Sequence, residues 1–359
     1  MAVHFHPLTV KKVTRETAEC VTVSFQIPDA LRSHFLFKEG QNITLKTKID
    51  GQEVRRSYSL CTAPHEDEIK VAIKKVEAGL FSQYANNVLK AGDVLEVLPP
   101  VGKFNAKVSG AEAGHHLGIA AGSGITPIIS IIKHILKTQP LSSFTLVYGN
   151  KSRSSIIFFE ELEGLKNKFM QRFNLVHVLS QEHTDAALNY GRINKDKLAS
   201  LQQSVAYSSF ENIYLCGPAE MIFEASAYLE SLGIDKGKIH FELFTTPGQV
   251  KTAQVLPNVA VPSGLSSNIS IKVDGRSFQF NLAGQGQNIL DAALAQGADL
   301  PYACKGGVCC TCRAKLISGE VSMDVNYALE PEEVEQGFIL TCQSHPRSEN
   351  IVIDFDIKS

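Results

Sequence analysis

Apolar and polar positions alternate in short runs over roughly the first 107 residues. The clearest runs cover residues 21–27, 42–46 and 69–73, and Asp50 and Gly51 lie between two runs as a turn. Successive side chains of a strand point to opposite faces of a sheet, so this pattern predicts antiparallel strands with one buried face. The close spacing of strands and turns favours a small β-barrel over residues 1–107.

From about residue 113, apolar runs alternate with segments of helical length. The predicted strands cover residues 117–121, 144–148, 174–179, 212–216 and 239–244, and the predicted helices cover 128–137, about 155–165, 195–201 and a segment that ends at Leu232. Strands that alternate with helices indicate a parallel sheet, whose ligands lie outside the carboxyl ends of the strands. We therefore expect an α/β domain over residues 113–245.

Proline, glycine and serine are frequent in residues 246–267, which predicts a semi-extended linker. Beyond it, strands over 269–273, 277–282, 313–317 and 351–355 and a helix over 288–296 predict a small α+β domain covering residues 268–359. Four acidic residues also follow there, at Glu330, Glu332, Glu333 and Glu335. They indicate either a solvated helix or a surface that steers a basic partner.

Composition limits the possible functions. A chain of 359 residues suggests two or three domains, and a net charge of −2 gives no general attraction to nucleic acid or to an anionic membrane. No apolar run is long enough to cross a bilayer, and the N-terminus has no apolar signal core. Eight cysteines without that signal fit the reducing cytoplasm. His115 and His116 are expected in a polar turn before a strand rather than in a metal site.

Cysteines near the C-terminus have the spacing of iron ligands. Cys304, Cys309 and Cys312 form a C-x4-C-x2-C pattern, and Cys342 follows after 29 further residues. This is the plant-type [2Fe–2S] spacing, and Gly306 and Gly307 allow backbone amides to approach the cluster sulfurs. A zinc site favours two separated C-x2-C pairs, and disulfide frameworks are typical of small secreted chains. Cys310 occupies no ligand position in this pattern.

A cation, an aromatic ring and hydroxyls follow one another on a predicted strand of the barrel, at Arg56, Ser57, Tyr58 and Ser59. A tyrosine can stack on a planar ring, an arginine can bind phosphate and a serine can hydrogen-bond a ring nitrogen, although such residues are also ordinary on a barrel surface. Residues 79–82 then open a helix. Their glycine and serine indicate either a pyrophosphate site or a plain N-cap.

Three predicted strand ends of the α/β domain carry turn residues, in 122–127, 148–150 and 216–218. The first is a glycine-rich turn between a buried strand and a helix, which presents backbone amides to a phosphate. It lacks the G-x-G-x-x-G spacing of a Rossmann fingerprint. Cys216 is either a small buried hydrophobic residue or a group that faces a reacting nicotinamide.

The order of these motifs resembles the ferredoxin–NADP reductase superfamily, joined at its C-terminus to a plant-type ferredoxin. Residues 297–309 and 326–331 are most similar to reductase components of bacterial ring-1,2-phenylacetyl-CoA epoxidases. The resemblance implies a flavin-binding barrel, a parallel-sheet NADP-binding domain and a ferredoxin-like domain. Related sequences usually carry a different small residue at Cys310, whose thiol would add sensitivity to oxidation.

The resemblance also implies roles for individual residues. Ser59, Cys216 and Glu242 would act in hydride transfer, and Cys304, Cys309, Cys312 and Cys342 would hold the cluster. FAD would be bound by Arg56, Ser57, Tyr58, Ser59, Gly79, Leu80, Phe81, Ser82 and Phe244. NADPH would be bound by Gly122, Ser123, Gly124, Thr126, Pro127, Lys151, Arg153, Ser180, Cys216, Gly217 and Pro218. Lys151, Arg153 and Ser180 favour NADPH over NADH, although Gln181 stands where some relatives have arginine.

These roles imply an electron path from NADPH through FAD and the [2Fe–2S] cluster to a di-iron epoxidase complex of phenylacetate degradation. A flavin can take electrons in pairs and release them singly, which a cluster requires. Two alternatives stay open at this point: a reductase of another aromatic-ring hydroxylase, and a non-catalytic flavin/iron–sulfur subunit for electron transfer or redox sensing.

Overall fold

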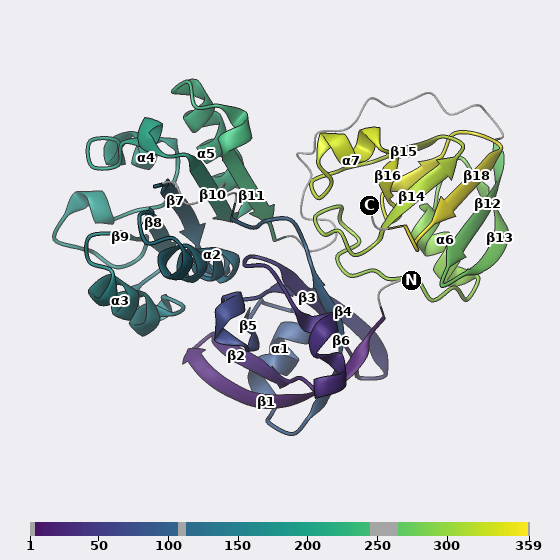
Figure 1. Cartoon of the computed structure of the whole chain (residues 1–359), viewed down its shortest axis with the longest axis horizontal. Helices are drawn as coiled ribbons and strands as arrows, with labels where there is room; N and C mark the ends of the chain where they lie inside the picture. Colours follow the sequence, from purple (N-terminus) through teal and green to yellow (C-terminus); the bar gives the residue numbers. More distant parts are fainter. Residues whose placement is uncertain (1–3, 107–112, 245–264, 358–359) are drawn as a thin grey trace. The chain divides into compact units, whose positions relative to one another are not determined.

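A computed structural model describes residues 4–106, 113–244 and 265–357 of the chain (Figure 1). Contacts between residues divide the chain into two units. One unit contains His6–Val54 and Tyr58–Phe244, and the other consists mainly of the C-terminal residues.

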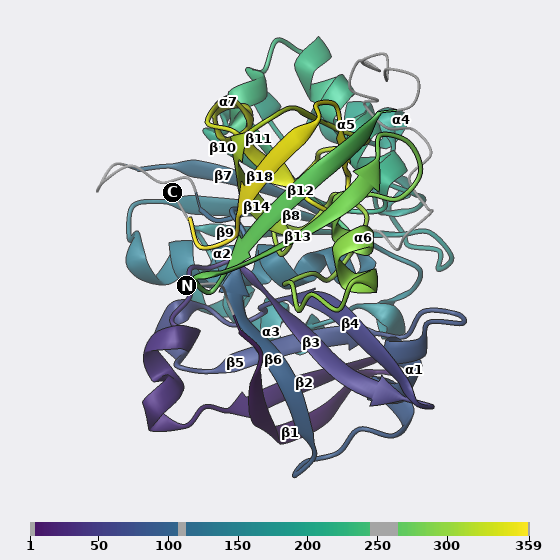
Figure 2. The same cartoon turned by 90° about the vertical axis from the view of Figure 1, so that its right-hand side faces the viewer.

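The first domain is an antiparallel sheet of six strands in the order β4-β3-β6-β1-β2-β5 (Figure 2). The elements are β1 (His6–Thr17), β2 (Cys20–Gln26), β3 (Asn42–Ile49), β4 (Gln52–Ser59), β5 (Ile69–Lys74), α1 (Leu80–Asn87) and β6 (Val94–Val101). An isolated antiparallel bridge between Leu60 and Val71 connects the two edges of the sheet and closes it into the predicted barrel. Its core is mostly aliphatic, with the fully buried Ile43 and Val97, and also contains Phe25, Phe35 and Phe81.

The turn between β3 and β4 shows why the alternating pattern gives a hairpin here. Asp50 and Gly51 have positive φ angles of 50° and 78°. Two successive positive φ angles form the turn whose twist matches that of paired strands, and Asp-Gly is among the sequences that tolerate it. Asp274 and Gly275 repeat this geometry in the C-terminal domain, with φ angles of 50° and 71°.

The second domain is a parallel sheet in the order β11-β10-β7-β8-β9. Its elements are β7 (His115–Ala121), α2 (Ile125–Thr138), β8 (Ser143–Asn150), α3 (Phe159–Lys168), β9 (Phe173–Leu179), α4 (Lys195–Leu201), β10 (Asn212–Gly217), α5 (Ala219–Ser231) and β11 (Ile239–Leu243). Helices α2 and α3 lie on one face of the sheet, and α4 and α5 lie on the other (Figure 1).

The strand order places a topological switch point between β7 and β10. The chain runs from β7 outward to β8 and β9, and then crosses to β10 and β11 on the other side. Connections that leave two neighbouring strands in opposite directions open a crevice at the carboxyl ends of those strands. The turns after Ala121 and after Gly217 lie at this point.

The C-terminal domain combines a mixed sheet, β13-β12-β18-β14-β16, with the pair β15-β17. Its elements are β12 (Ser266–Val273), β13 (Arg276–Ala283), α6 (Ile289–Ala295), β14 (Arg313–Ser318), β15 (Val321–Met323), α7 (Pro331–Glu335), β16 (Phe338–Leu340), β17 (Ser344–Pro346) and β18 (Asn350–Asp354). Asn288 caps α6 by accepting a 2.8 Å hydrogen bond from the Asp291 amide. The α+β prediction is confirmed.

Several local predictions need correction. His115 and His116 lie within β7 rather than in a turn, and His116 is fully buried because the apolar stretch of the strand includes it. Burial lowers the pKa of His116 to about 4. The helix predicted from about residue 155 begins at Phe159, after a short 3₁₀ turn. Most of the predicted linker lies outside the described residues, and its last residue, Ser267, already belongs to β12.

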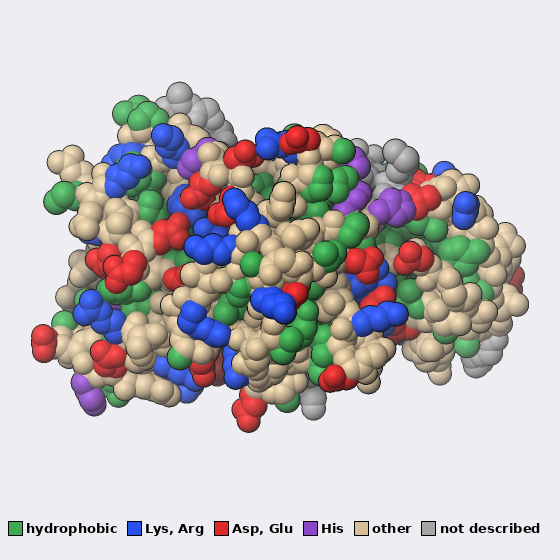
Figure 3. All heavy atoms as spheres, turned by 90° about the horizontal axis from the view of Figure 1, so that it is seen from below, with side chains coloured by type: hydrophobic (Ala, Val, Ile, Leu, Met, Phe, Trp, Pro, Cys, Tyr) green, Lys and Arg blue, Asp and Glu red, His purple; other side chains and the backbone are tan. Residues whose placement is uncertain are grey.

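The acidic segment forms α7, but Glu333 is not solvated as predicted. Its side chain is buried and lies 3.1 Å from the Arg313 guanidinium, and it also accepts a hydrogen bond from the Glu330 amide. Elsewhere on the surface, acidic and basic side chains are interspersed, as one face of the molecule shows (Figure 3). In the described parts of the chain, no helix has the length and apolar character that a membrane span requires.

Candidate functional site

The turn after β7 is held in one conformation by two close contacts. Gly122 has a φ of +53°, and its carbonyl accepts a 2.8 Å hydrogen bond from the Tyr148 hydroxyl on β8. A Cβ atom on Gly124 would lie 2.0 Å from the Cys216 carbonyl oxygen on β10, so only glycine fits there. The glycines therefore let the ends of β7 and β10 approach one another at the switch point.

The N-terminus of α2 follows directly from this turn. The Thr126 hydroxyl donates to the Ser123 carbonyl at 3.0 Å, and Pro127 occupies the first helical turn, where its missing N–H is not needed. On the other side of the turn, Lys74 Nζ lies 3.4 Å from the position that a Cβ atom of Gly122 would take. The turn thus combines helix N-terminal amides with a cation, as a pyrophosphate requires.

Gly217 and Pro218 occupy the corresponding position after β10. A Cβ atom on Gly217 would lie 2.7 Å from the Met221 side chain and 3.2 Å from the backbone of Ala121, so the two turns are closely packed. Pro218 is the N-cap of α5. The structure therefore brings together all three predicted strand ends, because β7 pairs with both β8 and β10 and the Tyr148 hydroxyl contacts the Gly122 turn.

The three residues predicted to act in hydride transfer also lie close together. The Ser59 hydroxyl on β4 donates a 2.8 Å hydrogen bond to Glu242 on β11, and Cys216 is the register partner of Glu242 on the neighbouring strand. Burial raises the pKa of Glu242 to about 7, although hydrogen bonds from Ser59 and Asn42 favour its charged form. A carboxyl group that titrates near neutral pH therefore lies at this junction.

Cys216 is fully buried in the core around α2. Burial raises the pKa of its thiol well above the usual value, and the Glu242 carboxylate adds to this effect. The thiol is therefore neutral, as expected for a small core residue, and the alternative that Cys216 faces a nicotinamide stays a prediction.

Two of the residues predicted to bind the flavin, Tyr58 and Phe244, present aromatic rings. Tyr58 is half-buried, with its ring centroid 5.6 Å from that of Phe81 in α1. Phe244, directly after β11, is 38% exposed and is therefore available to a planar ligand. Arg56 donates to the carbonyl of Arg55 at 2.7 Å. Half-exposed rings of this kind fit an isoalloxazine, which needs flat apolar surfaces.

Residues 79–82 form the start of α1, with Gly79 as N-cap and Leu80 as the first helical residue. The Ser82 hydroxyl donates to the Gly79 carbonyl and accepts from the Val76 amide, each at 3.0 Å. It thus fixes the turn rather than pointing freely outward. A Cβ atom on Gly79 would lie 2.5 Å from Ser82 Oγ, so a glycine is required. The first-turn amides lack helical acceptors, which fits a phosphate.

The loops after β8 and β9 are joined by hydrogen bonds. The Ser180 amide donates to the Asn150 carbonyl at 2.9 Å and the Gln181 amide to the Lys151 carbonyl at 2.8 Å. These bonds bring together the predicted cations and hydroxyl of the NADPH site. Arg153 lies over the Phe159 ring, and its backbone amide donates to Glu182 at 2.8 Å. A carboxylate therefore lies at this loop as well.

The four predicted cluster ligands come in two pairs. The Cys304 and Cys309 sulfurs are 3.1 Å apart, longer than a disulfide bond, and a hydrogen bond links the thiols of Cys312 and Cys342. Among the described residues, no three His, Cys, Asp or Glu side chains surround a single ion position. Two pairs are what a [2Fe–2S] cluster requires, because two thiolates bind each of its two irons.

Backbone amides surround these sulfurs. The Gly306 amide lies 3.3 Å from Cys304 Sγ. A hydrogen bond from Cys309 lowers the pKa of Cys304 to about 6, opposed by burial and assisted by the amides of Gly306 and Val308. Gly307 has a φ of +72°, and a Cβ atom there would lie 2.8 Å from Val325. The residues thus fit an anionic cluster held in a curled loop.

Cys310 is not part of this arrangement. Its thiol donates to the Ala328 carbonyl at 3.1 Å. The sequence pattern had given it no ligand position, and its contact in the structure is with a backbone carbonyl.

Sequence reasoning missed several residues that contact the predicted sites. They are Asn42, Lys74, Glu182 and Gln343. Glu182 and Gln343 had a local signal, since Glu182 follows Ser180 by two positions and Gln343 directly follows Cys342. The others reach their sites through strand pairing or loop contacts, which one sequence does not display.

Three domain families match the chain in the order of the three domains. Residues 7–106 match the oxidoreductase FAD-binding domain, residues 119–226 the oxidoreductase NAD-binding domain, and residues 271–347 the 2Fe-2S iron-sulfur cluster binding domain. The matches agree with the chemistry of the three sites and show which cofactors the domains bind.

Relatives with assigned functions are similar over nearly the whole chain. A component of the 1,2-phenylacetyl-CoA epoxidase of Escherichia coli (strain K12) is 44% identical over 99% of this chain and 98% of its own. The ferredoxin reductase component of 3-ketosteroid-9-alpha-monooxygenase from Rhodococcus rhodochrous is 33% identical over 97% of this chain and 96% of its own. Among solved structures, phthalate dioxygenase reductase aligns with a TM-score of 0.58 and 22% identity over 98% of each chain, which shows the same fold.

Proposed function

The chain belongs to the reductase components of oxygenases, which join FAD-binding, NAD-binding and 2Fe–2S domains, and we propose that it supplies electrons from NADPH to an epoxidase of phenylacetyl-CoA. The observation that carries the proposal is the 44% identity to the component of the E. coli epoxidase, which extends over all three domains. The physiological acceptor would be the di-iron oxygenase complex of phenylacetate degradation. No disulfide joins the eight cysteines, all of which lie in the described parts of the chain, and this favours the reducing cytoplasm as its location.

When bound, FAD accepts two electrons as a hydride and passes them on singly, as a [2Fe–2S] cluster requires. The chain's own residues would hold the cofactors in place for this transfer. Tyr58 and Phe244 offer flat surfaces to the flavin ring, and Arg56 with the amides at the start of α1 would bind its pyrophosphate. Cys304, Cys309, Cys312 and Cys342 would bind the two irons in pairs.

The nucleotide would lie across the switch point between β7 and β10. The amides at Gly122–Gly124 and the Lys74 ammonium would bind its pyrophosphate. Lys151 and Arg153, in the joined loops after β8 and β9, would bind the 2′-phosphate that distinguishes NADPH from NADH. Glu182 accepts from the Arg153 backbone, so its carboxylate is engaged in shaping the loop.

The Ser59–Glu242 pair would bind and transfer a proton beside the hydride-transfer position. The Ser59 hydroxyl donates to Glu242, and the carboxyl changes charge near neutral pH. A pair of this kind can hold a proton on the Glu242 oxygen and pass it through the serine hydroxyl. Cys216 would supply a neutral, close-packed surface at the same point.

A reconstituted assay tests the proposed acceptor. The purified chain, loaded with FAD and iron–sulfur cluster, is combined with the oxygenase components of phenylacetyl-CoA epoxidase, NADPH, oxygen and phenylacetyl-CoA. We expect NADPH-dependent formation of the ring epoxide and none without the reductase. Rapid cytochrome c reduction without epoxide would show an intact reductase with another acceptor. No NADPH oxidation at all, despite bound cofactors, would contradict the reductase role and favour a redox-sensing protein.

A second acceptor is favoured by the 33% identity to the ketosteroid monooxygenase reductase component. Ring hydroxylases use reductases with the same three domains, so nothing in the cofactor sites separates the two possibilities. Parallel assays with a ring hydroxylase in place of the epoxidase would decide between them by the coupling of NADPH oxidation to product.

A further inference from the structure

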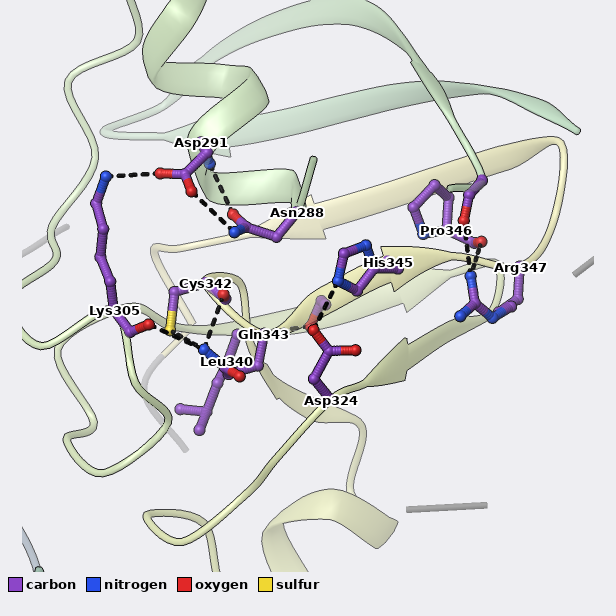
Figure 4. Close-up of polar contacts among 12 residues, drawn as sticks. Asn288, Asp291, Lys305, Asp324, Leu340, Cys342, Gln343, His345, Pro346 and Arg347 are labelled. Carbon is purple, nitrogen blue, oxygen red and sulfur yellow. Dashed lines mark hydrogen bonds and ion pairs between the residues drawn. The ribbon is translucent and has the colours of Figure 1, made fainter. Parts of the chain in front are cut away.

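Gln343 follows the last predicted cluster ligand, and the residue is only 8% exposed. Its main chain is fixed on both sides: its amide donates to the Leu340 carbonyl at 2.9 Å, and its carbonyl accepts from the Asp324 amide at 2.9 Å. These bonds orient the side chain towards the loop that carries the other three ligands (Figure 4).

The Gln343 side-chain amide makes three contacts through one nitrogen. Nε2 lies 3.1 Å from the Lys305 carbonyl, 3.0 Å from the Cys342 carbonyl and 3.6 Å from Cys342 Sγ. Lys305 belongs to the cluster loop and has a positive φ of 51°, so the hydrogen bond holds its carbonyl in an uncommon backbone conformation. One side chain therefore connects the two segments that supply the ligands.

The hydrogen bond from Gln343 Nε2 to Cys342 Sγ is stronger when the sulfur carries a negative charge. Hydrogen bonds to an ionised acceptor are about twice as strong as those between neutral groups, and an iron-bound cysteine is a thiolate. Nε2 has two N–H groups and three acceptors within reach. Extra negative charge on the cluster would strengthen the hydrogen bond to Cys342 Sγ relative to those to the two carbonyl oxygens. A donor at a ligand sulfur favours the reduced cluster and raises its reduction potential.

We propose that Gln343 is a positioning residue for the cluster, which donates a hydrogen bond to the Cys342 ligand and raises the reduction potential. The proposal rests on the proposed ligation by Cys342. It gives this domain a side-chain donor in addition to the backbone amides of the loop.

Gln343→Met tests the proposal, because methionine keeps a similar length and removes the donor. Gln279→Met is the matched control, since Gln279 is exposed on β13, the sheet edge opposite to β16. Iron content is determined first, and the cluster midpoint potential is then measured by anaerobic titration. We expect fully loaded Gln343→Met to have a more negative potential, equivalent to roughly a threefold to tenfold less favourable reduction, where tenfold is 59 mV for one electron. The control should match the wild type.

A loaded Gln343→Met protein with wild-type potential would overturn the proposal. If that variant does not retain iron, a measurement on the wild type decides. Pulsed EPR of the reduced cluster, with ¹⁵N in glutamine side chains only, should show a nitrogen coupled to the cluster, and absence of this coupling would overturn the proposal. A wild-type protein that holds no cluster would instead contradict the ligand assignment, on which the proposal depends.

Discussion

The Ser59 hydroxyl donates a 2.8 Å hydrogen bond to the Glu242 carboxylate, although 183 positions separate the two residues. Ser59 ends a strand of the barrel, and Glu242 lies on the edge strand of the parallel sheet. The bond therefore joins the predicted flavin domain to the predicted nucleotide domain where their cofactors would meet. It also places a group that titrates near pH 7 at that junction.

The pH dependence of flavin reduction should report on this pair. The pKa of Glu242 is raised to about 7, so the carboxyl is neutral below that pH and charged above it. Ser59→Ala removes a hydrogen bond that favours the charged form, and should shift the inflection of the pH–rate profile upward. Glu242→Gln should abolish the inflection. Stopped-flow reduction by NADPH between about pH 5.5 and 9 measures both, and an unchanged inflection in Glu242→Gln would assign it to another group.

Lys133 on α2 should contribute to stability by joining two carboxylates. It is 5% exposed and lies 2.8 Å from Glu66 and 2.9 Å from Glu161. Burial raises the pKa of Glu66, but Lys133 outweighs this effect and holds the pKa below its usual 4.5. We expect Lys133→Met to lower the free energy of unfolding by about 1–3 kcal/mol at pH 7, because both carboxylates are partly exposed.

The sign of the pH effect distinguishes this pairing from simple packing. A carboxyl with a lowered pKa stabilises the fold above its usual pKa and loses that contribution as pH falls. The deficit of Lys133→Met should therefore shrink below about pH 4.5. Urea unfolding followed by circular dichroism measures this loss of unfolding free energy at each pH. Lys137→Met is the control, because Lys137 is exposed. A deficit that is constant with pH would indicate lost packing rather than lost charge.

Lys74 should contribute to nucleotide binding. Its ammonium lies beside the Gly122 turn, where a pyrophosphate would bind. Lys74→Met should raise the KM for NADPH about tenfold with a smaller change in kcat, since it removes one charge-assisted contact of about 1.5 kcal/mol. Lys75→Met, which removes the same charge from the residue directly after β5, is the control. Equal effects of the two substitutions would assign the change to overall charge.

The preference for NADPH should depend on Arg153 and Lys151. Replacing both with alanine removes the two cations expected at the 2′-phosphate, and should lower kcat/KM for NADPH about 100-fold while changing that for NADH by less than about threefold. Steady-state cytochrome c reduction with each nucleotide measures the ratio. A parallel loss with both nucleotides would show that the loops support the fold rather than distinguish the phosphate.

The sequence was informative where the relevant residues are neighbours in the chain. The cysteine spacing, the glycine turn after β7 and the Cys216-Gly-Pro turn each express a local requirement, so their elements could be predicted. The switch point between β7 and β10 was not predicted, because it requires the order of strands in the sheet. That order depends on long-range pairing, which local periodicity does not encode.

Contacts between distant residues explain what could not be predicted. His116 has polar chemistry, but its strand buries it, and Glu333 is acidic, but Arg313 pairs with it in the interior. Lys74 directly follows a predicted strand and Gln343 directly follows a predicted ligand, and the sequence assigned neither side chain to a site. Their positions beside the predicted sites follow from tertiary packing, which overrides local preference.

The electron path is tested most directly by Cys342→Ser, with Cys310→Ser as the matched control. Cys342 is a predicted ligand, whereas the Cys310 thiol contacts the Ala328 carbonyl. Stopped-flow measurement with NADPH follows flavin reduction and electron delivery to an acceptor in the same sample. We expect the flavin of the Cys342→Ser protein to be reduced at the wild-type rate, with no cluster-dependent delivery of electrons to the acceptor. The Cys310→Ser protein should match the wild type in both flavin reduction and electron delivery. Wild-type delivery to the oxygenase by a Cys342→Ser protein that lacks the cluster would contradict the path.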